Sequence, residues 1–235
     1  MSVNLPLTEE TAMILSGDWS SEEADRLTQS WLAALSMDHK LPDWIRYMSG
    51  MSGKKFRYLI NKLVELVPNP RYLEIGSWAG STACSAMWGN NVSVTCIENW
   101  SHYGGPKDQF DKHSKQALSP SINLTLIEED FRKVDYSNIG KFNIYMYDGP
   151  HSLEDQYDGL MIAQPALDDL YYLIVDDYNQ KHDVQAGTEK AFRELGHKVI
   201  AQIQIITRWD TTHPALSHER SDWHNGYFIA LVSKQ

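Results

Sequence analysis

The stretch Tyr72-Leu73-Glu74-Ile75-Gly76-Ser77-Trp78-Ala79-Gly80 decides how this chain folds. Its first four residues have the character of a short buried strand, and the glycines that follow indicate a turn into a helix that starts near Ser81. Glycine lets a backbone adopt positive φ and approach a ligand closely, and the free N–H groups at a helix N-terminus attract a carboxylate or a phosphate. The stretch therefore predicts a strand, a turn and a helix with a ligand at the turn.

The alternation of strand-like and helix-like runs continues to the C-terminus. Strand-like runs cover residues 72–75, 92–97, 122–127, 142–147, 171–175, 199–207 and 227–232, and helix-like runs lie near 80–89, 107–117, 153–161 and 184–195. Repeated strand–helix units predict a parallel sheet covered on both faces, and the last two strands, which no helix separates, are expected to pair antiparallel. The predicted fold class is α/β: a doubly wound, mostly parallel, seven-stranded sheet with an N-terminal helical extension.

The chain divides at Pro68-Asn69-Pro70, which interrupts any helix. Before this point apolar residues recur at helical spacing, most clearly in the stripe from Phe56 to Val67. Residues 1–68 are therefore expected to form a helical cap over the ligand site, and residues 69–235 the ligand-binding domain. The basic side chains on the other faces of this stripe are interpreted as a solvated helix face rather than a phosphate site; they are Lys54, Lys55, Arg57 and Lys62.

Composition argues against several classes of protein. The chain has 235 residues with 31 acidic and 21 basic side chains, and its net charge of −10 argues against a nucleic acid as main partner and against electrostatic docking on a membrane. The N-terminus lacks the pattern of a signal peptide and no apolar run approaches the roughly 20 residues that span a bilayer, so a cytoplasmic protein is expected. Two cysteines, Cys84 and Cys96, are too few for a disulfide scaffold and are expected to be free thiols.

The spacing of the glycines bears on the ligand. Gly76 and Gly80 form Gly-x-x-x-Gly, which departs from the Gly-x-Gly-x-x-Gly of dinucleotide sites. Glu74, just before the first glycine, suits a ligand with a cationic group. Glu98, at the end of the next strand, can accept the hydroxyls of a ribose. The pattern therefore argues against a dinucleotide as the ligand, but it remains compatible with another ligand that contains a ribose.

The ordered set from Glu74 to Gly80, followed by Glu98 and then by Glu129-Asp130-Phe131, resembles the class I S-adenosylmethionine-dependent methyltransferases over residues 70–235. The resemblance implies S-adenosylmethionine as cofactor, with the glycine turn at its methionine part and the two later acids at its ribose and adenine. The implied cofactor-binding residues are Glu74, Gly76, Ser77, Gly80, Glu98, Trp100, Asp130 and Phe131. Trp100 and Phe131 would flank the adenine; the alternative for Trp100, as for Trp78, is packing under the turn.

Three aspartates follow two of the later strands. Asp148 ends the strand at 142–147, and Asp176 and Asp177 end the strand at 171–175. Because ligands lie beyond the carboxyl ends of the strands in open parallel sheets, and neighbouring strands are about 4.8 Å apart, these carboxylates are expected to face one point. Grouped oxygen ligands suit Mg²⁺, which would relieve their repulsion; the alternative is that they cap the following helices.

These segments also sharpen the resemblance. Asp148-Gly149-Pro150-His151 and Asp176-Asp177-Tyr178 look like the methyltransferases associated with O-methylation of sugars and antibiotics and their cephalosporin-hydroxylase-like branch. The resemblance implies that Asp148, Asp176 and Asp177 bind Mg²⁺. Pro150 stands where some members carry an aspartate proposed as base, which leaves His151 as the nearest candidate base and His182 as the second. The histidines at 213, 218 and 224 match no metal motif and are interpreted as part of a polar substrate loop.

The predicted function is therefore an S-adenosylmethionine-dependent, Mg²⁺-assisted O-methyltransferase that acts on a small hydroxylated or glycosyl acceptor. An alcohol becomes a good nucleophile only as it loses its proton, which a metal and a histidine can promote. Two alternatives stay open: a nucleotide-dependent oxidoreductase, and a non-catalytic cofactor-binding protein on the same fold. The sequence does not fix the oligomeric state, although an exposed apolar N-terminal helix would hint at a homo-oligomer.

Overall fold

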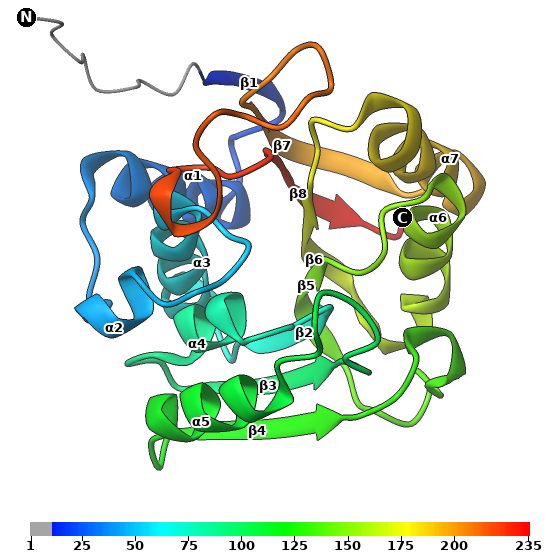
Figure 1. Ribbon diagram of the computed structural model, residues 1–235. Helices are drawn as coiled ribbons and strands as arrows, with labels where there is room; N and C mark the ends of the chain where they lie inside the picture. Colours follow the sequence, from blue (N-terminus) through cyan, green and yellow to red (C-terminus); the bar gives the residue numbers. More distant parts are fainter. Residues whose placement is uncertain (1–10) are drawn as a thin grey trace, which may run out of the picture.

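An eight-stranded sheet forms the centre of the protein, whose computed structural model describes residues 11–235 (Figure 1). The strands are β1 (Ala12–Gly17), β2 (Arg71–Ile75), β3 (Val92–Ile97), β4 (Ile122–Ile127), β5 (Phe142–Tyr147), β6 (Leu167–Asp176), β7 (Lys198–Ile206) and β8 (Tyr227–Ser233). Their order across the sheet is β1-β7-β8-β6-β5-β2-β3-β4. The pairs from β6 to β4 are parallel, β8 is antiparallel to β6 and β7, and β1 is antiparallel to β7.

The predicted fold class is confirmed, and all seven predicted strands are present. The last two, β7 and β8, pair antiparallel as expected. The predicted number of strands is one too low, because β1 lies in the segment that we expected to be helical. Its pairing with β7 runs from Ala12 opposite Ile206 to Gly17 opposite Ala201. This strand depends on the free edge that β7 offers, a tertiary feature that the short run at residues 12–17 does not encode locally.

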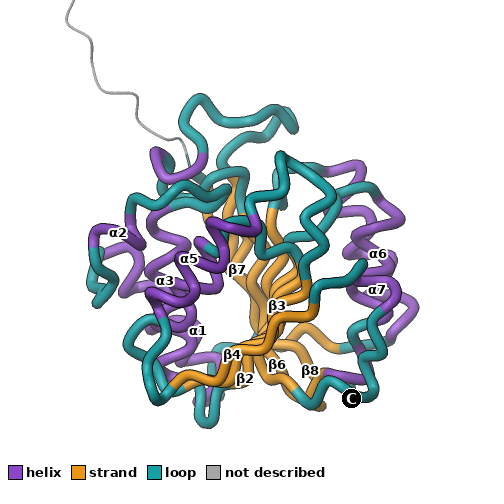
Figure 2. The backbone as a smooth tube through the Cα atoms, turned by 60° about the horizontal axis from the view of Figure 1, so that its bottom comes forward, coloured by secondary structure: helices purple, strands orange, loops and turns teal. Residues whose placement is uncertain are grey.

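Helices cover both faces of the sheet (Figure 2). They are α1 (Glu22–Ser36), α2 (Asp43–Arg46), α3 (Lys54–Leu66), α4 (Ser81–Met87), α5 (Lys107–Ala117), α6 (Leu153–Ile162) and α7 (Ala186–Leu195). One layer holds α1, α3, α4 and α5, each in contact with the next, and the other layer holds α6 and α7. Among residues 11–235, no helix has the combination of length and apolar composition that crossing a bilayer requires.

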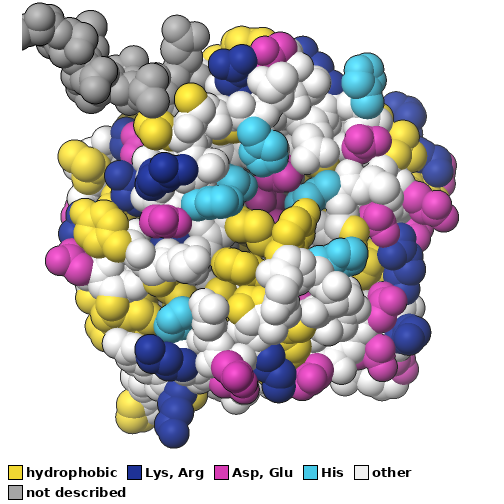
Figure 3. All heavy atoms as spheres, in the orientation of Figure 1, with side chains coloured by type: hydrophobic (Ala, Val, Ile, Leu, Met, Phe, Trp, Pro, Cys, Tyr) yellow, Lys and Arg dark blue, Asp and Glu magenta, His cyan; other side chains and the backbone are white. Residues whose placement is uncertain are grey.

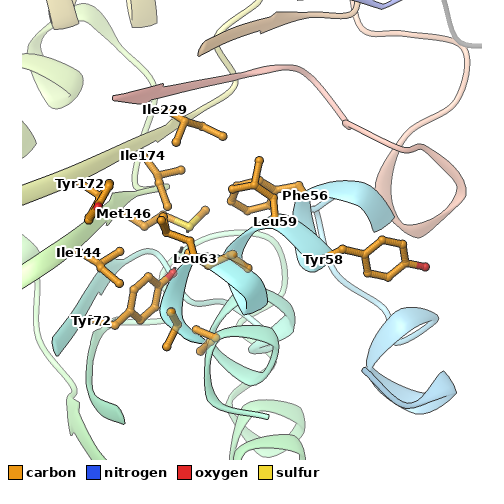
Figure 4. Packing of buried hydrophobic residues seen from close by; sticks show 14 of the residues in the cluster. Phe56, Tyr58, Leu59, Leu63, Tyr72, Ile144, Met146, Tyr172, Ile174 and Ile229 are labelled. Carbon is orange, nitrogen blue, oxygen red and sulfur yellow. Dashed lines mark hydrogen bonds between the residues drawn. The ribbon is translucent and has the colours of Figure 1, made fainter. Parts of the chain in front are cut away.

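Helix α3 joins the N-terminal segment to the sheet. Its residues Phe56, Leu59 and Leu63 point toward Met146 and Ile174 of the central strands, and all five side chains are 0% exposed (Figure 4). Fully burying a side chain of this size contributes roughly 1.5–3 kcal/mol. The helices before the break at Pro68-Asn69-Pro70 therefore share one hydrophobic cluster with the strands that follow it.

The basic side chains of α3 do not all lie on a solvated face. Lys54, Lys55 and Lys62 are partly exposed, but Arg57 is 0% exposed. The solvated-face interpretation is wrong for Arg57, because the loop at residues 45–52 folds over that side of the helix and offers its carbonyl oxygens to the guanidinium.

Candidate functional site

A cleft of about 1050 Å³ opens at the carboxyl ends of the strands. It is bordered by the segments that follow β2 to β6, by residues 49–51, and by three histidines of the loop between β7 and β8. Figure 3 shows histidine side chains around this hollow and acidic side chains within it. The cleft brings together nine predicted site residues: Gly76, Ser77, Glu98, Asp130, Phe131, Asp148, His151, Asp176 and Asp177. Four others do not line it: Glu74, Gly80, Trp100 and His182.

The turn after β2 requires glycine at its first position. Gly76 has a φ of +90°, and a Cβ there would lie 1.8 Å from the carbonyl oxygen of Asp148. The amide N–H of Asp148 donates to the carbonyl of Ile75 at 2.9 Å, so the two strand-end segments meet at this point. The glycine therefore brings the β2 turn directly against the segment that carries the first of the acidic residues.

Glu98 holds a fixed position at the end of β3. Its carboxylate accepts the backbone N–H groups of Trp78 at 2.9 Å, Asn99 at 2.9 Å and Trp100 at 2.8 Å. A carboxylate offers about four lone-pair positions, so one stays available toward the cleft. The arrangement suits a hydroxyl donor such as that of a ribose.

Two tryptophans shape the same region. Trp78 and Trp100 have φ of 43° and 50°, a left-handed conformation that residues with a Cβ rarely adopt outside strained or functional sites. Trp100 donates its ring N–H to the carbonyl of Trp78 at 3.1 Å, and its ring centre lies 5.8 Å from that of Phe110. Since Trp78 lines the cleft and Trp100 does not, packing under the turn is the better description for Trp100.

Three other predicted site residues, Glu74, Gly80 and His182, lie outside the lining of the cleft. Glu74 is 0% exposed, accepts hydrogen bonds from the hydroxyls of Tyr72 and Thr82, and burial raises its pKa to about 7. Gly80 is the N-cap of α4, and His182 is exposed on the helical turn at residues 181–185. Glu74 therefore braces the first turn of α4 from behind the cleft.

The acidic residues form two groups that share Asp176: Asp148, His151 and Asp176 in one, and Asp176, Asp177 and His224 in the other. Ligand atoms of Asp148, His151 and Asp176 all lie within 4.8 Å of one another. Burial raises the pKa of Asp148 and of Asp176 well above the usual range, and the charge of Asp177 adds to the rise in both. Asp176 is 2% exposed, and its Oδ1 has no hydrogen-bond partner among the described residues. Because a buried carboxylate oxygen without a partner is costly, this donor set fits a divalent cation.

His151 stands between the acidic side chains. Its Nε2 lies 3.7 Å from Oδ1 of Asp148 and 3.6 Å from Oδ2 of Asp177. Its Nδ1 is buried and makes no hydrogen bond to the part of the chain that the structure describes. The ring is therefore placed to exchange a proton in the cleft or to join the carboxylates around a cation.

His224, which the sequence placed only in a substrate loop, lies next to the acidic residues. It is 4% exposed, and its Nε2 lies 3.8 Å from Oδ1 of Asp177. Its Nδ1 accepts the backbone N–H of His218 at 3.0 Å, so the proton of the neutral ring sits on Nε2 and faces Asp177. Burial lowers the pKa of His224 to about 4, which keeps the ring neutral. The protonated Nε2 of His224 therefore faces Asp177 without offering a lone pair to a metal there, and the spacing of the histidines carries no signal of this placement.

A buried amide anchors the loop that carries His224. Asn179 donates its side-chain N–H groups to Thr207 at 2.8 Å and to Asn225 at 2.9 Å, and its Oδ1 accepts the backbone N–H of Thr207 at 3.0 Å. Asn179 follows the two aspartates at the end of β6. The network therefore ties both ends of the loop between β7 and β8 to the acidic site.

Comparison with known proteins agrees with this geometry. Residues 73–178, from β2 to just beyond β6, match a family described as a methyltransferase domain. No curated protein matches the chain significantly.

Solved structures share the fold at low sequence identity. The O-methyltransferase TomG from Streptomyces achromogenes, in complex with S-adenosylmethionine, is 15% identical with a TM-score of 0.53, over 89% of this chain and 90% of that one. A putative caffeoyl-CoA O-methyltransferase from Staphylococcus aureus is 12% identical with a TM-score of 0.51, over 90% and 92%. A putative RNA methyltransferase from Pyrococcus horikoshii is 14% identical with a TM-score of 0.51, over 89% and 98%. The fold is thus common to enzymes described as acting on quite different acceptors.

Proposed function

We propose that this chain, whose residues 73–178 match a methyltransferase domain, is a class I S-adenosylmethionine-dependent enzyme and a Mg²⁺-assisted O-methyltransferase of a small acceptor. The family match gives no support to the nucleotide-dependent oxidoreductase that the sequence left open.

We assign S-adenosylmethionine to the side of the cleft that follows β2, β3 and β4. Gly76 and Ser77 would lie against its amino-acid part, Glu98 would accept from its ribose, and Asp130 and Phe131 would border its adenine. The sulfonium is a cation, and an acidic wall favours it. The three backbone N–H groups that hold Glu98 in place support this assignment, since a preordered acceptor loses little freedom when it binds a hydroxyl.

The acidic charge of the cleft is the main observation behind the proposed class of acceptor. Eight carboxylates line it: Glu98, Glu129, Asp130, Asp148, Asp155, Asp176, Asp177 and Asp183. Among the described residues, the one lysine or arginine in the lining is Arg132, which already pairs with Asp155 at 2.7 Å and with Asp158 at 2.9 Å. Nucleic acids are bound largely through clustered cations, and like charges repel strongly in a cleft. This charge favours a small neutral or cationic acceptor over a nucleic acid.

The acidic residues and His151 supply the chemistry. Asp148, Asp176 and Asp177 would hold Mg²⁺, which when bound lowers the pKa of a hydroxyl that it coordinates. His151, whose Nε2 lies 3.7 Å from Asp148 and 3.6 Å from Asp177, would take the hydroxyl proton. The neutral ring of His224 lies 3.8 Å from Asp177, and the walls of the cleft would align the acceptor oxygen with the methyl group. His182 stays the second candidate for the base, although its exposure outside the cleft favours His151.

A transfer assay with fractionated acceptors tests the proposal. Radiolabel from the methyl group of S-adenosylmethionine should enter the neutral or cationic small molecules of a cell extract, should need a divalent cation, and should stay out of RNA and of anionic metabolites. The His151→Ala variant should lose most of this transfer, whereas His182→Ala should keep it. Label in RNA, or undiminished transfer after chelation, would overturn the acceptor class or the role of the metal respectively. Cofactor binding without transfer to any fraction would favour the non-catalytic alternative.

A further inference from the structure

Arg57 of α3 is a cation enclosed completely by the protein. It is 0% exposed, and its guanidinium makes six hydrogen bonds to residues 45–52, which are the end of α2 and the loop that follows it. The acceptors are the carbonyls of Ile45 at 2.8 Å, Arg46 at 3.3 Å, Met48 at 3.0 Å, Gly50 at 3.3 Å and Ser52 at 3.1 Å, and the hydroxyl of Ser52 at 3.0 Å. The side chain of Arg57 is therefore surrounded by, and hydrogen-bonded to, the backbone of residues 45–52.

Burying a charged side chain costs desolvation free energy that an apolar side chain would not. An apolar side chain would pack on α3 without the desolvation of a charge, and burial lowers the pKa of Arg57 to about 10. The guanidinium still keeps its proton at neutral pH. Its five N–H groups have fixed directions in one plane, so the carbonyls of the loop must take up positions that suit them. What the arginine contributes beyond packing is therefore the conformation of the loop.

The loop held in this way forms one wall of the cleft. Residues 49–51 line the cleft together with Ser81 and Thr82 at the start of α4. The hydroxyls of Ser52 and Ser81 lie 2.9 Å apart, and a Cβ at Gly50 would fall 2.3 Å from both Cβ and Oγ of Ser81. The wall thus touches α4 directly after the glycine turn.

We infer that Arg57 is a positioning residue for the cofactor, because it holds residues 49–51 as the wall that closes the amino-acid end of bound S-adenosylmethionine. This inference rests on the proposed cofactor and on its orientation along the glycine turn. The adenosine end lies at Glu98, Asp130 and Phe131, which belong to other elements and do not contact the loop by any bond described above. Loss of the wall therefore affects the two ends of the cofactor differently.

Two ligands separate these ends. S-adenosylhomocysteine carries the amino-acid part, and 5′-methylthioadenosine lacks it but keeps the nucleoside and the sulfur. Calorimetric titration of the full chain with each ligand should show that Arg57→Met weakens S-adenosylhomocysteine at least tenfold and 5′-methylthioadenosine less than about twofold. The matched control Lys62→Met removes a partly exposed cation from the same helix and should change neither affinity.

A second variant keeps the test decisive if Arg57→Met does not fold. Gly50→Ala keeps the arginine, but its Cβ would lie 2.3 Å from Ser81 and 3.2 Å from Nη2 of Arg57, so it displaces the same wall and should show the same selective loss of S-adenosylhomocysteine. Equal weakening of both ligands in a folded variant, or no weakening of either, would overturn the role of Arg57. If the unaltered chain bound neither ligand, the proposed function on which this role rests would be overturned instead.

Discussion

Replacing Gly76 by alanine should both destabilise the protein and damage the cleft. The added Cβ would lie 1.8 Å from the carbonyl oxygen and 2.4 Å from the carbonyl carbon of Asp148, and the residue has a φ of +90°. The clashing atoms belong to backbone, so no side-chain rotation relieves the contact. The left-handed conformation costs a residue with a Cβ about 1–2 kcal/mol, and overpacking adds about 1–3 kcal/mol. The sum is a loss of roughly 2–5 kcal/mol in the free energy of unfolding.

Gly140→Ala separates the two contributions. Gly140 has a φ of +99°, but a Cβ there would meet nothing within 4 Å. Urea denaturation should therefore show a loss of about 1–2 kcal/mol for Gly140→Ala and a further loss of about 1–3 kcal/mol for Gly76→Ala. Binding of S-adenosylhomocysteine should weaken in Gly76→Ala alone, because the clash moves Asp148 and the turn apart. Equal denaturation midpoints for the two variants would refute the reasoning, because the close approach to Asp148 would then contribute nothing to the loss in free energy of unfolding.

Three further predictions concern the acidic site and its supports. Asp176→Asn should weaken Mn²⁺ binding, measured by electron paramagnetic resonance as a stand-in for Mg²⁺, at least tenfold, while Glu189→Gln on α7 should not; unchanged binding in Asp176→Asn would remove Asp176 from the ligand set. Burial raises the pKa of Glu74 to about 7 from its ordinary value of 4.5, so the protein is most stable below the lower value and loses roughly 3 kcal/mol of that stability as the pH rises to 7 and above. Glu74→Gln should therefore gain stability relative to the unaltered chain between pH 4.5 and 7.5 in urea titrations, and a pH-independent difference would contradict the buried carboxyl. Asn179→Ala should lower the free energy of unfolding by about 1–3 kcal/mol through unsatisfied buried groups and speed proteolysis within residues 208–226; resistance equal to that of the unaltered chain would show that the amide does not anchor the loop.

The parts of the site that were predictable from sequence are those encoded locally. The strand, turn and helix around Gly76 follow from a contiguous pattern, and the positions of Glu98, Asp148, Asp176 and Asp177 follow from the rule that parallel strands end at one edge. Each of these residues lies next to the end of its own strand, so no knowledge of distant segments was needed.

The features that sequence reasoning missed depend on contacts between distant segments. Strand β1 exists because β7 leaves an edge free, and Arg57 is buried because the loop at residues 45–52 turns its carbonyls inward. His224 reaches Asp177 because the network around Asn179 folds a long loop back over β6. For Trp100 the sequence left two roles open, because the left-handed backbone that accompanies the bond from its ring N–H to the carbonyl of Trp78 has no signature in the residue pattern.

Binding of S-adenosylhomocysteine tests the central claim most directly, because every role proposed for the cleft assumes that this cofactor lies along the glycine turn. Isothermal titration should show one site per chain in the unaltered protein. Loss of a hydrogen bond to a charged group is worth about 1.5–3 kcal/mol, so Glu98→Ala should weaken the affinity roughly 10- to 100-fold. Glu189→Ala, which removes an exposed acid on α7, should leave the affinity unchanged. No binding to the unaltered chain, or equal affinity in the Glu98→Ala variant, would contradict the account.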